Sequence, residues 1–228
     1  MAVHGKRYRS DLDKTPDRET PVPLTEAVNR VKAFKNVKFD QSVEVAIWLG
    51  IDAKQADQAV RGSVSLPHGI GKTKRVVAFC SDDKVAAAKE AGAVEAGGEE
   101  LVKKIEGGWL EFDVAVASPD MMKVVARLGR ALGPKGLMPS PKSGTVTPNV
   151  IDAVKEYGAG KVEFRNDAGG NVHAVVGKQS FEPQQLEENA QAFIDHIQRI
   201  KPAAAKGHYV KQISLSGTMT PGVRVELP

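Results

Sequence analysis

Hydrophobic and polar residues alternate along several segments of the chain, which predicts β-strands with one face exposed to water. These segments are residues 42–49, 161–165, 171–176 and 223–227. Two shorter segments, 76–80 and 114–117, are continuously apolar, which is typical of parallel strands covered by helices on both faces. The strands with a wet face therefore belong to both ends of the chain, and the buried strands belong to its middle.

Helical spacing and capping residues predict helices between the strands of the middle segment. Ser81 is placed to cap a helix that ends before Gly92, and a Gly97–Gly98 turn opens a second helix. Ser118-Pro119 and Thr147-Pro148 each combine a cap with a proline at the first helical position. This alternation of strands and helices predicts an α/β, Rossmann-like three-layer domain.

The two chain ends each supply one predicted amphipathic helix. Thr25 is placed to cap the first, and Pro183 starts a longer one that stops before Pro202. With the alternating strands these helices make an α+β domain, but only if both ends fold together. We therefore predict a discontinuous first domain, residues 1–67 plus 160–228, with residues 68–159 inserted as the second. Glycines flank the insertion at 69, 71, 158 and 160, and they serve either a paired hinge or tight turns.

Composition excludes several classes of protein. The chain has 228 residues, of which 26% are charged, and no apolar run approaches the roughly 20 residues that cross a bilayer. We therefore predict a cytosolic protein without membrane contact. The single cysteine, Cys80, lies in an apolar run and is predicted to be a packed core residue.

The sequence contains no complete catalytic or cofactor-binding motif. Gly69 to Thr73 resembles part of a phosphate loop, but Leu66 stands where that motif needs glycine and a strand follows instead of a helix. The five histidines show no metal-ligand spacing; His173 and His196 are predicted to be surface or edge groups. We therefore expect no enzyme, metal, cofactor or small-molecule substrate.

Charge is nearly balanced overall but uneven along the chain. There are 32 basic and 28 acidic residues, a net charge of +4, yet residues 27–39, 58–81 and 121–151 contain no acid. Such stretches create local positive potential, or they are solvated faces. The loop from Gly129 to Gly144 adds four glycines and three prolines to three cations. It is either a phosphate-binding surface that uses Lys135 and Lys142, or a plain ordered connection.

The chain ends offer a second candidate surface. It includes Arg7, Tyr8 and Arg9, the pair Lys38-Phe39, and the turn from Gly217 to Gly222. Phe39 directly precedes an alternating strand, so it is either a core residue or a contact residue.

Several sequence blocks, in order, resemble the bacterial branch of the L-one family of large-subunit ribosomal proteins. The loop 129–146 carries the strongest resemblance, and further blocks are 4–8, 49–52, 57–62, 64–69, 162–167, 176–178 and 218–219. The resemblance implies the discontinuous two-domain fold. It also implies a ribosomal protein that is a monomer off the ribosome and binds a stem region of 23S rRNA.

The resemblance further implies a mobile stalk near the exit (E) site, contact with E-site tRNA during release of deacylated tRNA, and translational repression through the protein's own operon mRNA. The family's RNA surface maps onto Glu26, Lys38, Phe39, Arg165, Thr218 and Met219. Thr220 stands where the family usually has glycine, which would be costly if that position needs a positive φ.

Two rival hypotheses come from other classes of protein. A nucleotide-dependent enzyme would bind ATP or NAD, but the chain lacks every glycine fingerprint for them. A DNA-binding regulator would need a recognition helix that is basic along its outer face, and none of the predicted helices has one.

Overall fold

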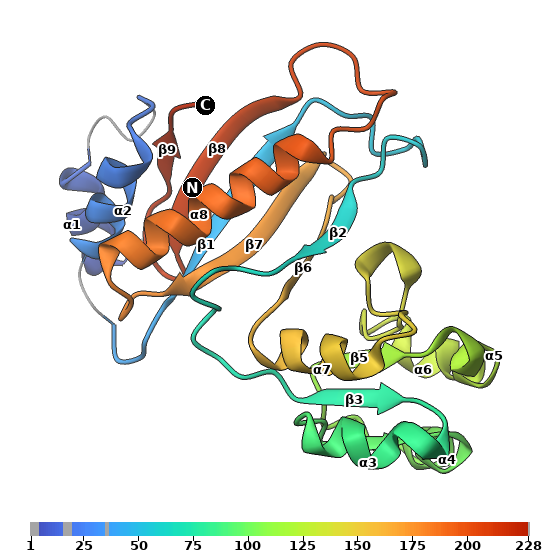
Figure 1. Ribbon diagram of the computed structural model, residues 1–228. Helices are drawn as coiled ribbons and strands as arrows, with labels where there is room; N and C mark the ends of the chain where they lie inside the picture. Colours follow the sequence, from blue (N-terminus) through green and yellow to red (C-terminus); the bar gives the residue numbers. More distant parts are fainter. Residues whose placement is uncertain (1–4, 16–19, 35–36, 228) are drawn as a thin grey trace. The chain divides into compact units, whose positions relative to one another are not determined.

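The computed structural model describes residues 5–15, 20–34 and 37–227. The chain divides into two compact units (Figure 1). Unit 1 runs to Gly71 and resumes at Val162, and unit 2 spans Lys72–Lys161. The domain boundaries placed from the sequence, at 67/68 and 159/160, lie a few residues before these points.

A four-stranded antiparallel sheet in the order β7-β1-β8-β9 organises unit 1. Its strands are β1 (Ser42–Leu49), β7 (Asn171–Lys178), β8 (Val210–Gly217) and β9 (Val223–Val225). The alternation in β1 has the predicted effect, because Val43, Val45 and Ile47 are buried while the residues between them are not. The alternating segment at 223–227 forms a strand only as far as Val225, and β8 was not predicted.

Helices pack on the apolar face of this sheet. Helix α8 (Pro183–Arg199) lies along it, and α2 (Leu24–Lys32) packs against α8 and β9 (Figure 1). Helix α8 begins at Pro183 as predicted. The predicted cap at Thr25 is wrong: Pro23 precedes the helix, and the Thr25 hydroxyl donates to Glu187 Oε1 at 2.5 Å. The short helix α1 (Lys6–Asp13) was not predicted.

Unit 1 also contains a two-stranded ribbon of β2 (Arg61–Val64) and β6 (Val162–Arg165). Strand β6 was predicted, and β2 was not. Arg61 lies opposite Arg165 in this antiparallel pair, and Asn166 Oδ1 accepts a hydrogen bond from the Val60 N–H at 2.9 Å. The ribbon's apolar residues Val64 and Phe164 join the core of unit 1.

A three-stranded parallel sheet in the order β4-β3-β5 organises unit 2. The strands are β3 (Val76–Phe79), β4 (Glu95–Gly97) and β5 (Val114–Ala117), of which β4 was not predicted. Side chains alternate between two apolar clusters: Val76 and Ala78 pack on one face, Val77 and Phe79 on the other. Helices α3 (Asp82–Glu90) and α7 (Val150–Gly158) cover the first face, and α4 (Glu99–Glu106) covers the second.

Two details of unit 2 differ from the sequence-based prediction. The helix expected after Ser118 is a series of short turns: η1 (Pro119–Met121), α5 (Met122–Val125), η2 (Ala126–Leu128) and α6 (Gly129–Leu132). The tighter 3₁₀ winding brings residues three apart, Val125 and Leu128, to the same buried side. Helix α7 starts after Asn149, so the cap expected at Thr147 is also wrong.

The predictions for Cys80 and His173 are confirmed, since Cys80 is buried and His173 is exposed. Burial raises the pKa of the Cys80 thiol. His196 is half-buried with its ring 5.6 Å from that of Phe164, so its prediction as a surface group is only partly right. Loss of hydration, together with the nearby charge of Arg199, lowers the pKa of His196.

Candidate nucleic-acid interface

The segment before β1 and the turn after β8 meet at one end of the sheet in unit 1. They are neighbours because Val43 in β1 lies opposite Gly217 in β8. The Thr218 N–H donates to the Ser42 carbonyl at 3.0 Å, and the Ser42 N–H donates to Thr218 Oγ1 at 3.1 Å. We call Lys38, Phe39, Thr218 and Met219, which lie in these two segments, the Phe39–Met219 surface.

Two large apolar side chains are exposed on this surface. Phe39 is 54% exposed and Met219 is 50% exposed, so the alternative that Phe39 is a core residue is wrong. The other large apolar residues exposed in the described part of the chain are Trp48, Val94 and Leu227. Two such side chains on hydrogen-bonded, ordered segments are typical of a surface that is covered in a complex.

Gln41 holds the two segments in register. Its side chain is fully buried, and its Oε1 accepts a hydrogen bond from the Met219 N–H at 2.9 Å. Its Nε2 donates to Gln179 Oε1 at 2.7 Å, and its carbonyl accepts from the Gln179 N–H at 2.8 Å. Neither glutamine was predicted as a site residue, because their partners are distant along the chain and no local pattern marks them.

Thr220 closes the turn from the inside. Its Oγ1 accepts a hydrogen bond from the Gly217 N–H at 2.7 Å, and its side chain is 9% exposed. No residue other than glycine has a positive φ in the described chain, so Thr220 carries no strain of that kind. Thr220 therefore supports the turn, and the neighbouring Met219 is the exposed side chain.

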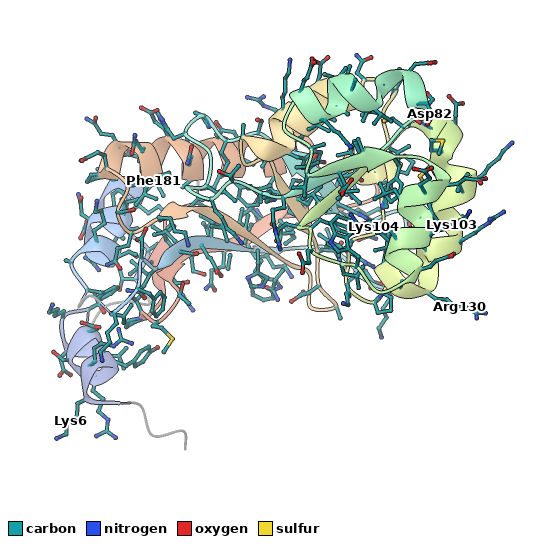
Figure 2. All side chains as sticks on the ribbon, turned by 90° about the horizontal axis from the view of Figure 1, so that it is seen from below. Lys6, Asp82, Lys103, Lys104, Arg130 and Phe181 are labelled. Carbon is teal, nitrogen blue, oxygen red and sulfur yellow. The ribbon has the colours of Figure 1, made fainter. Side chains whose placement is uncertain are left out.

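Helix α1 attaches to the same turn. Arg7 Nη2 donates to the Met219 carbonyl at 2.7 Å, and Arg7 Nη1 lies 3.7 Å from Oδ2 of the buried Asp11. Arg7, a candidate contact residue in the sequence, therefore positions the turn. Lys6 and Arg9 are exposed, and the side chain of Lys6 extends away from the ribbon (Figure 2).

The other candidate residues of unit 1 lie elsewhere on it. Glu26 is in the first turn of α2, where Arg30 Nε donates to its Oε1 at 2.9 Å. Arg165 is exposed at the end of β6, near the start of β7, whereas the Phe39–Met219 surface adjoins the end of β7. The eight residues of β7 span roughly 26 Å. Arg165 therefore does not belong to the Phe39–Met219 surface.

The Asp167 side chain closes the turn beside Arg165 with hydrogen bonds. Asp167 Oδ1 accepts from the N–H groups of Gly169 and Asn171, and Asp167 Oδ2 accepts from the Asn171 side chain at 3.0 Å. The hydrogen bonds from Asn171 hold the pKa of Asp167 below its ordinary value. This end of β6 is thus a second fixed site on unit 1 that presents a cation.

The loop after α6 in unit 2 is exposed and also ordered. Lys135 and Lys142 are both exposed, and Lys142 lies in a 3₁₀ turn, η3 (Pro141–Ser143). Thr145 Oγ1 accepts from the Ser140 N–H at 2.8 Å, and Tyr157 of α7 donates to the Ser143 carbonyl at 2.7 Å. Arg130 of α6 also extends away from the ribbon (Figure 2).

The described residues contain no group of three or more histidine, cysteine, aspartate or glutamate side chains arranged to hold a metal ion. In the same part of the chain, none of the helices has both the length and the apolar character needed to cross a bilayer.

An apolar, hydrogen-bonded surface on one unit and cations on an ordered loop of the other are typical of a binding protein. The ribosomal protein L1p/L10e family matches residues 31–221, and the chain belongs to this family. The resemblance seen in the sequence is therefore confirmed.

Curated relatives match nearly the whole chain. "Large ribosomal subunit protein uL1" of Protochlamydia amoebophila is 50% identical over 227 residues, which cover 100% of this chain and 96% of that protein. The protein of the same name from Chlorobium luteolum is 52% identical over 222 residues, covering 97% and 96%. The one from Nocardioides sp. is 51% identical over 222 residues, covering 97% and 92%. These relatives carry the name of a ribosomal protein, so the family is not one of enzymes.

Proposed function

We propose that the protein is a constituent of the large ribosomal subunit and binds a stem region of 23S rRNA there. Its family and the names of its relatives support this role. For unit 1 the proposal rests on one observation. Phe39 and Met219 are both about half exposed, and the segments that carry them are joined by a hydrogen bond to the buried Gln41.

Structured RNA is recognised through its shape, its ribose hydroxyl groups and its phosphates. A rigid surface that combines apolar side chains, a threonine hydroxyl and one lysine fits such a target, and it does not need a strongly basic protein. The net charge of +4 is compatible with this mode of recognition. In the proposal, Arg165 and Glu26 contribute to binding from outside the Phe39–Met219 surface.

Unit 2 has a different part in the proposal. Lys135 and Lys142 add contacts to phosphates, which are sensitive to salt and slow dissociation. On the ribosome the protein forms the mobile stalk near the E site, contacts E-site tRNA and helps to release deacylated tRNA. Off the ribosome it is a monomer that binds its own operon mRNA and represses its translation. The protein needs no cofactor for any of these roles.

Binding of the intact protein to the 23S rRNA stem, compared with an unrelated hairpin over a salt series, tests the proposal. We expect tight binding to the stem that persists as salt rises, and weak binding to the hairpin that salt abolishes. Equal affinities at every salt concentration would contradict the proposal. Adding the leader RNA of the protein's own operon as a competitor tests the repressor role, since it should displace the stem.

A further inference from the structure

The polar face of the sheet in unit 1 carries an exposed tryptophan. Trp48 is 45% exposed and belongs to β1, which lies between β7 and β8. Its cross-strand neighbours are Asn171 of β7 and Gln212 of β8. Ala46, two residues earlier on the same face, lies opposite Ser214 of β8. None of these five residues is buried, so a partner can reach this face of the sheet.

A hollow of about 150 Å³ adjoins the Trp48 ring, and the same five residues line it. The small side chain of Ala46 beside the large indole leaves this space. The hollow is larger than the roughly 30 Å³ that one water occupies and smaller than the roughly 300 Å³ of a pocket for a drug-sized molecule. It therefore fits a single flat ring that lies against the indole.

Polar side chains surround the hollow. In the described chain no hydrogen bond joins the side chain of Gln212 or Ser214 to another residue. Asn171 Nδ2 donates to Asp167 Oδ2 at 3.0 Å, which leaves Asn171 Oδ1 as an acceptor. Amide and hydroxyl groups both donate and accept, as do the edges of nucleobases. These side chains can therefore bond to the edge of a base that lies on Trp48.

A bulge in β8 brings Lys211 to the other side of the indole. The register skips Lys211 after the Trp48–Gln212 pair, so Lys211 is the extra residue of the bulge. Its Nζ lies 4.7 Å from the centroid of the Trp48 ring, a cation–π contact. Lys211 follows the strand towards Leu49, whereas the hollow extends towards Ala46. The cation thus holds one face of the ring, and the face towards the hollow stays open.

The charges on this face of the sheet are mixed. Its charged and titratable residues are Lys211, Arg224, His173, Glu44 and, beside Asn171, Asp167. With cations and carboxylates in balance, the face attracts neither phosphates nor a highly charged peptide strongly. A neutral flat ring with a polar edge is the better match. Because the chain belongs to a family of ribosomal proteins, RNA is the source of such rings.

We propose that Trp48 stacks an unpaired base of RNA on its face opposite Lys211, with the edge of the base bonded to the side chains around the hollow. Stacking on an aromatic ring tolerates every base, so the ligand is single-stranded RNA without a fixed sequence. The site goes beyond the proposed function, because it is separate from the Phe39–Met219 surface. Trp48 lies six residues along β1 from Ser42, a distance of about 20 Å.

Tryptophan fluorescence tests the stacking directly. The chain has two tryptophans, so Trp109→Phe leaves Trp48 as the only one. We expect a single-stranded adenosine oligomer of about twelve nucleotides to quench the fluorescence of this variant until binding saturates. The duplex of the same oligomer with its uridine complement is the matched control. It should not quench, because its bases are paired and stacked on one another.

Substitutions at Trp48 separate an aromatic contact from an apolar one. Trp48→Leu should raise the Kd for the oligomer by about fivefold or more, because stacking is lost. Trp48→Phe keeps a ring and should stay within about threefold of the wild type. Leu227→Ala, at another exposed apolar position, should stay within about twofold. Fluorescence anisotropy of a labelled oligomer measures the Kd, and urea unfolding checks that each variant retains its fold.

Three results would overturn the inference. Equal quenching by the duplex would mean that unpaired bases are not what binds. Equal Kd values for Trp48→Leu and Trp48→Phe would mean that stacking contributes nothing. A Trp48 signal that does not respond to single-stranded RNA would assign this face to a protein neighbour. A protein that binds the oligomer through Trp48 but does not prefer the 23S rRNA stem contradicts the proposed function alone.

Discussion

Buried polar side chains hold the turn that carries Thr218 and Met219. Gln41 anchors it from the segment before β1, and Thr220 anchors it from within. Gln41 accepts from the part-buried N–H of Met219, and Thr220 accepts from the buried N–H of Gly217. A backbone that is fixed beforehand lowers the entropy cost of binding, so in the proposed function these two residues support recognition by holding the turn in place.

Replacing Thr220 by valine tests this support. The variant keeps the shape of the side chain but removes the oxygen that accepts from the Gly217 N–H. We expect the free energy of unfolding to fall by about 1–3 kcal/mol and the affinity for the rRNA stem to fall with it. Thr220→Ser is the control, because it retains the hydroxyl. A valine variant as stable as the wild type in urea unfolding would show that the hydrogen bond is dispensable.

Met219 and Lys142 should affect RNA binding in different ways. Met219→Ala removes an apolar contact, so we expect the Kd for the rRNA stem to rise by about tenfold or more at every salt concentration. Lys142→Ala removes a cation, so it should lower the slope of log Kd against log salt by about one at most. Filter binding over a salt series measures both. A uniform loss for Lys142→Ala and a change of slope for Met219→Ala would reverse the assigned roles.

Tyr209 makes the free energy of unfolding of unit 1 depend on pH in the alkaline range. Its hydroxyl is buried without a hydrogen-bond partner in the described chain, and burial raises the pKa of Tyr209 to about 12. In the unfolded chain the pKa is about 10, so between these values the folded state holds more protons. The free energy of unfolding contributed by Tyr209 is therefore fully present below about pH 10 and is lost as the pH rises towards 12.

Tyr209→Phe should remove this contribution to the alkaline loss. Near neutral pH we expect the variant to be as stable as the wild type or more stable by up to about 1 kcal/mol, because no hydrogen bond within the described chain is lost. Urea unfolding near pH 8 and pH 11 compares the two proteins. An equal loss of stability in both over this range would contradict the assignment.

At the scale of elements, Asn189 ties α8 to its surroundings in unit 1. Its side chain is fully buried; Nδ2 donates to the carbonyls of Val176 and Gly69 at 2.8 and 2.9 Å, and Oδ1 accepts from the His68 N–H at 3.0 Å. One side chain thus joins the helix to β7 and to the segment that leaves the unit. Packing of Leu186 and Phe193 on the same helix supplies the apolar part of this attachment.

Asn189→Ala should lower the free energy of unfolding by about 3 kcal/mol, because buried backbone groups lose their partners and a cavity is left. Gln191→Ala, at an exposed position of the same helix, is the control and should change stability by less than about 0.5 kcal/mol. Denaturant unfolding measures both variants. Equal effects would show that the helix is held by apolar packing alone.

At the scale of the whole molecule, each unit has apolar clusters of its own. The cluster of unit 1 draws only on residues before Gly71 and after Lys161, and the two clusters of unit 2 draw only on residues between these points. An apolar cluster within a single unit is the condition for that unit to fold without the other.

Deleting residues 72–161 and joining Gly71 to Val162 by a flexible linker tests this independence. We expect the remaining unit to unfold cooperatively and to keep its preference for the rRNA stem, with a smaller salt dependence because Lys135 and Lys142 are gone. Circular dichroism during urea unfolding reports the fold, and filter binding reports the affinity. A folded variant that no longer distinguishes the stem from an unrelated hairpin would place specific recognition in unit 2.

Features that depend on neighbours along the chain were predictable from the sequence alone. Alternation predicted β1, the apolar runs predicted β3 and β5, and Pro183 marked the start of α8, because side-chain period and backbone restriction are local properties. The ordered sequence blocks, including Thr218-Met219, identified the family. None of these patterns depends on which strands pair in the folded protein.

The folded structure shows which distant segments meet. It placed β8 beside β1, separated Arg165 from Phe39 and Met219, and buried Gln41 against a turn 178 residues away. Hydrogen bonds across such separations leave no periodic trace in the sequence, because their geometry exists only once the sheet has formed. For that reason the hydrogen bond between the side chains of Gln41 and Gln179 could not have been predicted from the sequence.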